Sequence, residues 1–190
     1  MKSKPKVKEY LEEHHTKIWA RADFTELSKV DYVNNNLAES FNSRIKKYKG
    51  LHLVDLLDKI MQYIMEKFDL RKRICIDHFI GHNIIPAVMK ALMEKTKGLE
   101  MSIVRRSPTE AEVTATDREK REWRYPVDLE KWTCSCRQWQ VTGKPCIHAL
   151  FFVTSLRGDA SAIDKYVHKY YSVEMFRAIY AENLPALEGK

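Results

Sequence analysis

The sequence predicts an α+β protein in which a helical N-terminal part is followed by a small antiparallel sheet and a metal-binding finger. Before residue 98, apolar residues recur every three or four positions, as in helices that bury one face. After residue 98, short segments alternate apolar with polar residues, as strands do. Three cysteines and a histidine then fall within residues 134–148. We therefore expect a helical part over 1–98, strands with the finger over 99–160 (core 125–156) and a C-terminal tail over 161–190.

The helical part is predicted to contain helices over residues 1–20, 37–48, 51–73 and 83–97. The clearest apolar stripe belongs to the third of these helices. Three asparagines at 34–36 can cap the second helix through their short amide side chains. Pro86 suits the first turn of the fourth helix, and Gly98 suits its end.

The part after residue 98 is predicted to contain strands over residues 101–104, 112–116 and 123–129. The charged run over 117–124 is interpreted as a solvated hairpin connection. Pro126 has no N–H to donate, so it restricts the third strand to a sheet edge or a bulge. A helix is expected over 147–156, and the aromatic-rich segment 166–176 is expected to pack against the rest of the protein.

Composition limits the classes of function. The chain has 190 residues and a net charge of +7, which allows contact with nucleic acid but also fits a merely soluble basic surface. No apolar run is long enough to span a membrane, and the first residues lack the apolar stretch of a secretory signal. We expect an intracellular protein with no membrane association and no small-molecule substrate.

The pattern Cys134-Ser-Cys136, nine residues, Cys146-Ile-His148 predicts a zinc site. Thiolate and imidazole are the ligands that four-coordinate zinc prefers. Residues two apart on a strand face the same side, so Cys134 and Cys136 can reach one ion if the chain bends after them. Cys146 would open a helix, with His148 in its first turn. Buried or redox-active cysteines are the alternative interpretation.

A complete set of four ligands leaves no position for a substrate water, so the predicted zinc ion is structural rather than catalytic. Three thiolates, one neutral imidazole and Zn²⁺ sum to a charge of about −1, which Arg137 and Lys144 could offset. Trp132 and Trp139 flank the cysteines and are expected to form the small core around the ion. Cys75 lies in the helical part and is not expected to bind zinc.

The cysteine and histidine spacing resembles the SWIM zinc finger. The sequence of residues 127–139 and 142–149 resembles the finger on the C-terminal side of plant Mutator-like transposases. Residues 166–174 resemble the segment that follows the finger in that family. The resemblance extends to residues 19–24 and 35–42, which look like the last part of the RNase H-like catalytic domain of that family. It implies that this chain corresponds to the C-terminal part of such a transposase.

The same resemblance implies that Glu39 corresponds to the third acid of an Asp-Asp-Glu triad, which holds two metal ions in the family. Its position in the first turn of a helix is also explained by the helix dipole alone. Only 38 residues precede it, and Asp23 and Asp31 lie in the wrong context to supply the other two acids. We therefore expect no catalysis by this chain alone.

Three interpretations stay open. The first is a transposase-derived module whose finger binds DNA or another protein, acting in the nucleus. The second is a functional part of a transposase that needs a missing upstream half, and the third is a transposon remnant without function. Basic residues after Glu39 and at the end of the third helix could contact DNA phosphates, although solvated helix faces explain them more simply; they are Arg44, Lys46, Lys47, Lys49, Arg71, Lys72 and Arg73.

Overall fold

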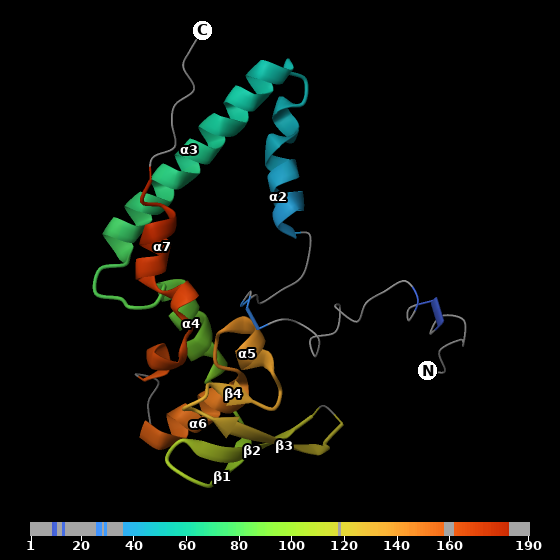
Figure 1. Cartoon of the computed structure of the whole chain (residues 1–190), viewed down its shortest axis with the longest axis vertical. Helices are drawn as coiled ribbons and strands as arrows, with labels where there is room; N and C mark the ends of the chain where they lie inside the picture. The colour runs from blue at the N-terminus through green and yellow to red at the C-terminus, as the bar shows by residue number, and fades with distance from the viewer. Residues whose placement is uncertain are drawn as a thin grey trace. The chain divides into compact units, whose positions relative to one another are not determined.

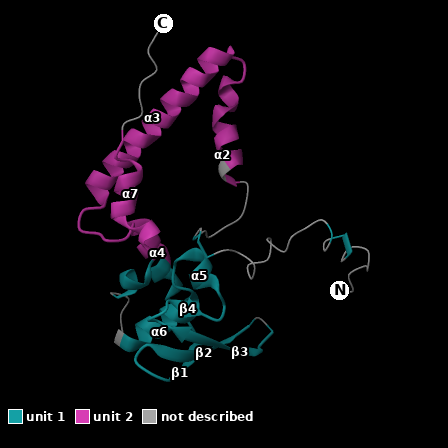
Figure 2. Ribbon diagram, in the orientation of Figure 1, with its two compact units in different colours: residues 1–31, 92–167 teal, residues 32–91, 168–190 magenta. Residues whose placement is uncertain are grey.

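The computed structural model describes residues 9, 10, 13, 26, 27, 29, 36–117, 119–157 and 162–182 (Figure 1). The chain divides into two compact units (Figure 2). We call residues 1–31 with 92–167 the sheet unit, and residues 32–91 with 168–190 the helical unit. The helix predicted over 1–20 falls outside the described residues except at three positions, and the three-part domain division stays a prediction.

The helical unit begins with α2 (Asn36–Ile45), which continues as the 3₁₀ helix η3 (Lys46–Tyr48). The long helix α3 (Leu53–His78) follows. Both helices were predicted, but α3 extends five residues beyond the predicted end at Arg73. The extension has a tertiary cause. Ile74 and Cys75 near the end of α3, and Phe79 just after it, pack in one cluster with Val173 and Phe176.

The core of the helical unit forms where α3 meets α7 (Val173–Ile179). Cys75 and Val173 are buried there, and the rings of Phe79 and Phe176 meet edge to face with centroids 5.2 Å apart. Ser172 caps α7 by accepting a hydrogen bond from the Met175 N–H at 3.0 Å. The aromatic-rich tail therefore packs as predicted, in the form of a short helix that the periodicity did not reveal.

Helix α4 (Pro86–Lys95) begins at its proline, where the missing N–H costs nothing. The helix ends at Lys95, and Gly98 follows three residues later. Gly98 has a φ of +65°, a left-handed conformation that glycine adopts without strain. Leu92 is buried, with 1% of its surface exposed.

The sheet unit is built on a four-stranded antiparallel sheet in the order β1-β2-β3-β4. Its strands are β1 (Met101–Arg105), β2 (Glu110–Thr116), β3 (Glu122–Asp128) and β4 (Thr133–Cys134). In β2, Ala111 and Val113 are buried while their neighbours are not, so one face of the sheet points to the core. Val113 pairs with Tyr125, and Val127 pairs with both Ala111 and Cys134, so these side chains share the core face.

Helix α6 (Ile147–Arg157) contacts β2 and β3 and covers this core face. Its side chains Ala149, Leu150, Phe152 and Val153 are almost fully buried. The 3₁₀ helix η4 (Ile163–Tyr166) adds Ile163, which is also fully buried. The helical segment predicted over 147–156 is confirmed, and its apolar residues complete the core.

Pro126 occupies a position that behaves like a sheet edge, although β3 lies between two strands. It pairs with Glu112 of β2, while β4 pairs only with the next two residues of β3. The Pro126 carbonyl accepts a hydrogen bond from the Ser135 N–H at 3.0 Å, on the β4 side. Since the N–H and C=O of one strand residue point the same way, its missing N–H falls beyond the end of β4.

The α+β class is confirmed, with helices joined to a small antiparallel sheet that carries the cysteine and histidine cluster. Besides η4, two short elements of the sheet unit were not predicted. They are β4 and α5 (Gln138–Thr142), and both lie beside the cysteines. Within the described residues, no helix combines the length and the apolar character needed to cross a membrane.

Candidate metal centre

The four predicted zinc ligands come from a strand end, a tight turn and a helix start. Cys134 is the last residue of β4, and Cys136 lies in the turn that follows. The chain reverses at Arg137, which takes a left-handed conformation with φ +59°. Cys146 caps α6, because its carbonyl accepts the Leu150 N–H at 2.9 Å, and this places His148 in the first turn. The strand therefore ends at Cys134, and Cys136 reaches the site from the turn, so the two cysteines do not lie on one strand as the spacing argument assumed.

The ligand atoms of these residues converge on one point. The Nδ1 atom of His148 lies 3.6 Å from the Cys134 sulfur and 3.8 Å from the Cys146 sulfur. All four ligand atoms lie within 4.8 Å of one another. A tetrahedral zinc ion with Zn–S near 2.3 Å and Zn–N near 2.0 Å separates sulfur and nitrogen by about 3.6 Å. The geometry fits zinc, with His148 binding through Nδ1.

Hydrogen bonds from Gln140 and Arg137 hold the backbone of Cys134 in place. The Gln140 side chain accepts the Cys134 N–H at 3.3 Å and donates to the Cys134 carbonyl at 2.9 Å. The same carbonyl accepts the Arg137 N–H at 2.9 Å. Helix α5, which carries Gln140, therefore fixes the Cys134 backbone, and this role was not visible in the sequence.

The thiols influence one another strongly. Hydrogen bonds from Cys134 and Cys146 lower the pKa of Cys136 far below its usual range. The hydrogen bond to Cys136 raises the pKa of Cys134 to about 12, and hydrogen bonds with both other thiols raise the pKa of Cys146 well above the ordinary value. A divalent ion supplies the charge that lets all three sulfurs bind as thiolates.

The His148 ring is held in place by Tyr125 of β3. The two rings stack with centroids 3.7 Å apart and planes 13° apart. Tyr125 is half-buried on the core face of the sheet, and His148 is buried. The stack keeps the imidazole from rotating away from the sulfurs. No signal in the sequence linked these residues, because they lie on different elements.

Replacing Tyr125 with alanine should lower the zinc affinity by about tenfold or more, in the range known for residues that orient metal ligands. Tyr125→Phe keeps the stacked ring and should bind zinc as the native chain does. Competition with a chromophoric chelator measures both affinities. Equal affinities for the native chain and Tyr125→Ala, or an equal loss in both variants, would show that the stack does not orient His148.

The other residues predicted around the zinc site have separate outcomes. Trp139 is buried with 1% of its surface exposed, which confirms its core role, whereas Trp132 stacks on it and is only half-buried. Arg137 pairs with Glu26 at 3.6 Å. Burial lowers the pKa of Lys144. Cys75 lies in the core of the helical unit and is not among the clustered side chains.

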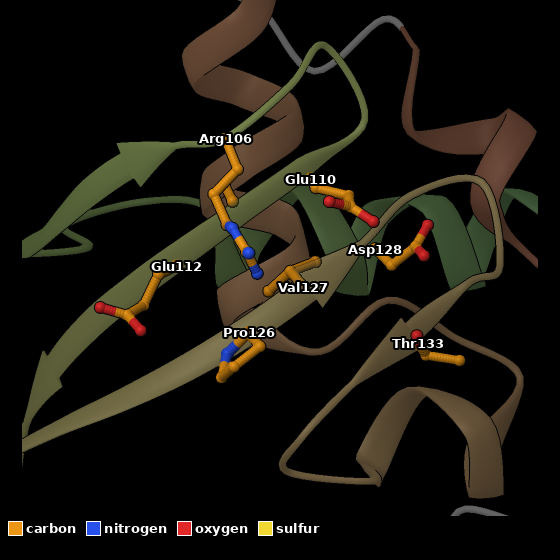
Figure 3. Close-up of a pocket in the computed structure, with 8 residues that line it drawn as sticks. Arg106, Glu110, Glu112, Pro126, Val127, Asp128 and Thr133 are labelled. Atoms are coloured by element: carbon orange, nitrogen blue, oxygen red, sulfur yellow. The ribbon is translucent and has the colours of Figure 1, made fainter.

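A recess of about 140 Å³ lies on the face of the sheet opposite the core face (Figure 3). Arg106 reaches over this recess, and Glu110 and Asp128 lie side by side at its rim. The Asp128 carboxylate accepts two backbone N–H groups and pairs with Lys131 at 3.0 Å. Glu112 pairs with Arg124 at 3.7 Å. The carboxylates of Asp128 and Glu112 are thus engaged in holding the strands and their turn, and we place no ligand there.

Glu39 is exposed in the first turn of α2. Among the described residues, the cysteine and histidine cluster is the group of three or more metal-binding side chains that the structure brings together. The predicted correspondence of Glu39 to a catalytic acid stays a prediction.

Comparison with known proteins agrees with the zinc site. Residues 113–155 match the family model of the SWIM zinc finger. No curated protein and no solved structure matches the chain. The match spans β3, β4, α5 and nearly all of α6, so the resemblance of the helical part to a Mutator-like transposase stays a prediction. The segment 113–155 is therefore similar to a SWIM zinc finger, with Cys134, Cys136, Cys146 and His148 positioned to bind one zinc ion.

Proposed function

We propose that this chain is a non-catalytic, transposase-derived module that acts in the nucleus and binds duplex DNA through its zinc-stabilised sheet unit. The observation that carries the proposal is the complete ligand set within a segment similar to a SWIM zinc finger. Four protein ligands leave no open position for a reacting water, which fits a structural ion that shapes a binding surface.

Charge supports DNA as the partner. The chain carries 33 lysine and arginine residues against 26 acidic residues, a net charge of +7. Contacts between such cations and phosphates release counterions and make binding depend on salt. A protein partner would be bound with a weak dependence on salt.

The proposed lack of catalysis rests on the needs of phosphoryl transfer. Two-metal chemistry requires several carboxylates that converge on a pair of divalent ions. Glu39 is the residue that matches the triad of the resembled family, and one carboxylate cannot hold two ions. The second candidate function is that of a functional part of a larger transposase, and the resemblance of Glu39 to the third acid of the triad supports it.

A titration of supercoiled plasmid and of a labelled duplex tests the proposal. We expect binding that weakens as salt rises, with a slope of log K against log salt of about −0.9 per phosphate contact. Removing zinc with a chelator should abolish it. Plasmid incubated with Mg²⁺ or Mn²⁺ should stay intact.

Two results would contradict this function. Duplex binding that is absent at low salt, or that persists after zinc is removed, would rule out the zinc-dependent DNA module. Metal-dependent nicking that disappears in Glu39→Gln would show that the chain is an enzyme. Glu39→Gln is otherwise expected to bind duplex DNA as the native chain does.

A further inference from the structure

A second candidate site lies in the helical unit, in a recess of about 420 Å³ between α2 and α3. The two helices are joined through η3 and belong to the same unit (Figure 2). Helix α2 contributes Phe41 and Arg44, which lie about one turn apart. Helix α3 contributes residues from three successive turns of one face, Tyr63, Lys67 and Arg71 among them. The recess is thus lined by both cations and aromatic rings.

No carboxylate in the described part of the chain forms an ion pair with Arg44, Lys67 or Arg71, the three cations of the recess. Each lies near an aromatic ring instead. The Arg44 guanidinium and the Lys67 ammonium lie 6.0 and 5.5 Å from the centre of the Tyr63 ring, and the Arg71 guanidinium lies 5.2 Å from that of Tyr180. A ring orients a cation without neutralising it, so the recess presents three positive charges to a ligand.

No carboxylate is among the lining residues, and Glu39 and Glu66, which are next to lining residues in the sequence, are exposed. Asp69 pairs with Arg73 at 2.7 Å. Asp58 accepts a hydrogen bond from the Gln62 amide at 2.8 Å. The charge of the recess therefore calls for an anionic ligand.

We infer that this recess binds a segment of single-stranded nucleic acid. Arg44, Lys67 and Arg71 would contact its phosphates, and Phe41, which is 37% exposed, would offer its ring to an unpaired base. Bases of a duplex are stacked inside it and cannot reach a ring in a recess. The inference goes beyond the proposed function, because the site consists of residues of the helical unit and contains no zinc ligand.

The spacing of the cations agrees with a strand rather than with a compact anion. Lys67 and Arg71 are four residues apart on a helix, a rise of about 6 Å. That is roughly two nucleotides of a stacked strand at about 3.4 Å each. Exposed Lys46, Lys47 and Lys49 follow Arg44 along the chain and offer further contacts beyond the recess. An acidic peptide would match the charge but would not use the exposed ring for stacking.

Fluorescence anisotropy with the full-length, zinc-loaded protein tests the inference. The probe is a labelled oligothymidylate, compared with a duplex of the same length and with an oligoglutamate peptide. The variant Arg44→Gln/Lys67→Gln/Arg71→Gln should lose about a hundredfold in affinity for the single strand at ~0.1 M salt. The slope of log K against log salt should become shallower by about 2, at about 0.7 for each of three lost contacts. Phe41→Ser should weaken binding without changing this slope.

Lys90→Gln/Lys95→Gln/Lys169→Gln is the matched control, because it removes the same charge from exposed positions outside the recess. It should bind the oligothymidylate nearly as the native chain does. Equal losses in both triple variants, an unchanged affinity in the recess variant, or tighter binding of the oligoglutamate peptide would overturn the inference. In each of these cases zinc-dependent duplex binding could still be intact, so the proposed function is tested separately.

Discussion

Replacing Cys136 or His148 with alanine is expected to remove zinc from the protein and to unfold the sheet unit. The apparent binding free energy of structural zinc is about 10–16 kcal/mol, and it becomes folding free energy when the site exists only in the folded state. The whole stability of a small domain is about 5–15 kcal/mol. The loss of zinc is therefore comparable to the stability of the unit that holds it.

The burial of the site makes this loss severe. Cys134, Cys146 and His148 expose 1%, 2% and 6% of their surfaces, so a fold without the ion would keep uncoordinated thiols and an imidazole in the core, and this cost favours unfolding. Metal analysis gives the zinc content, and circular dichroism gives the folded fraction. A chelator should reproduce the effect of either variant.

Cys75→Ser is the matched control for this experiment. Cys75 is buried in the helical unit beside Val173, and the Arg177 guanidinium donates to its sulfur at 3.4 Å. The variant should keep one zinc per chain, because Cys75 is not among the clustered ligands. Zinc retained by Cys134→Ala/Cys136→Ala would refute the assigned ligand set.

Replacing Trp139 with alanine should destabilise the zinc-loaded protein by about 3–5 kcal/mol, the usual cost of truncating a buried tryptophan. Trp139 is 1% exposed and stacks on Trp132 with ring centroids 6.4 Å apart. Its indole N–H donates to the Tyr166 carbonyl at 3.1 Å, which ties the finger to η4. The truncation therefore creates a cavity and also leaves a backbone acceptor unpaired.

Chemical denaturation in the presence of zinc measures this cost. Trp139→Phe should lose less, because it keeps most of the apolar volume and forfeits the hydrogen bond, which contributes about 1 kcal/mol. Trp123→Ala is the control at an exposed site, since Trp123 is 49% exposed, and its effect should be smaller than that of Trp139→Ala. Equal losses at positions 123 and 139 would mean that Trp139 does not anchor the core.

The zinc ligands could be predicted from the sequence because all four lie within residues 134–148. Over so short a range, strand alternation and the start of a helix limit where each side chain can point. The same local logic predicted α2, a helix with Pro86 in its first turn and three of the four strands, since periodicity, proline and glycine act on neighbouring residues. It placed the start of α4 at residue 83, three residues before the observed start at Pro86.

Contacts between distant segments could not be predicted in this way. The extension of α3 depends on its packing against α7. The two hydrogen bonds between the Gln140 side chain and the Cys134 backbone depend on α5, a five-residue helix that is too short to show periodicity. The predicted end at Arg73 was wrong for this reason, because the local pattern carries no information on what packs against the last turn.

By itself, the sequence therefore determined the α+β class and the four zinc ligands, because each depends on spacing within a few turns or strands. Only the tertiary structure decided that Tyr125 stacks on His148, and that Arg44 shares one recess with Lys67 and Arg71. Tyr125 and His148 lie on different elements, and so do Arg44 and the two α3 cations. The register of the strands and the cover of α6 on the sheet bring the first pair together, and the chain turn through η3 that joins α2 to α3 brings the second set together. No local pattern of residues records such arrangements.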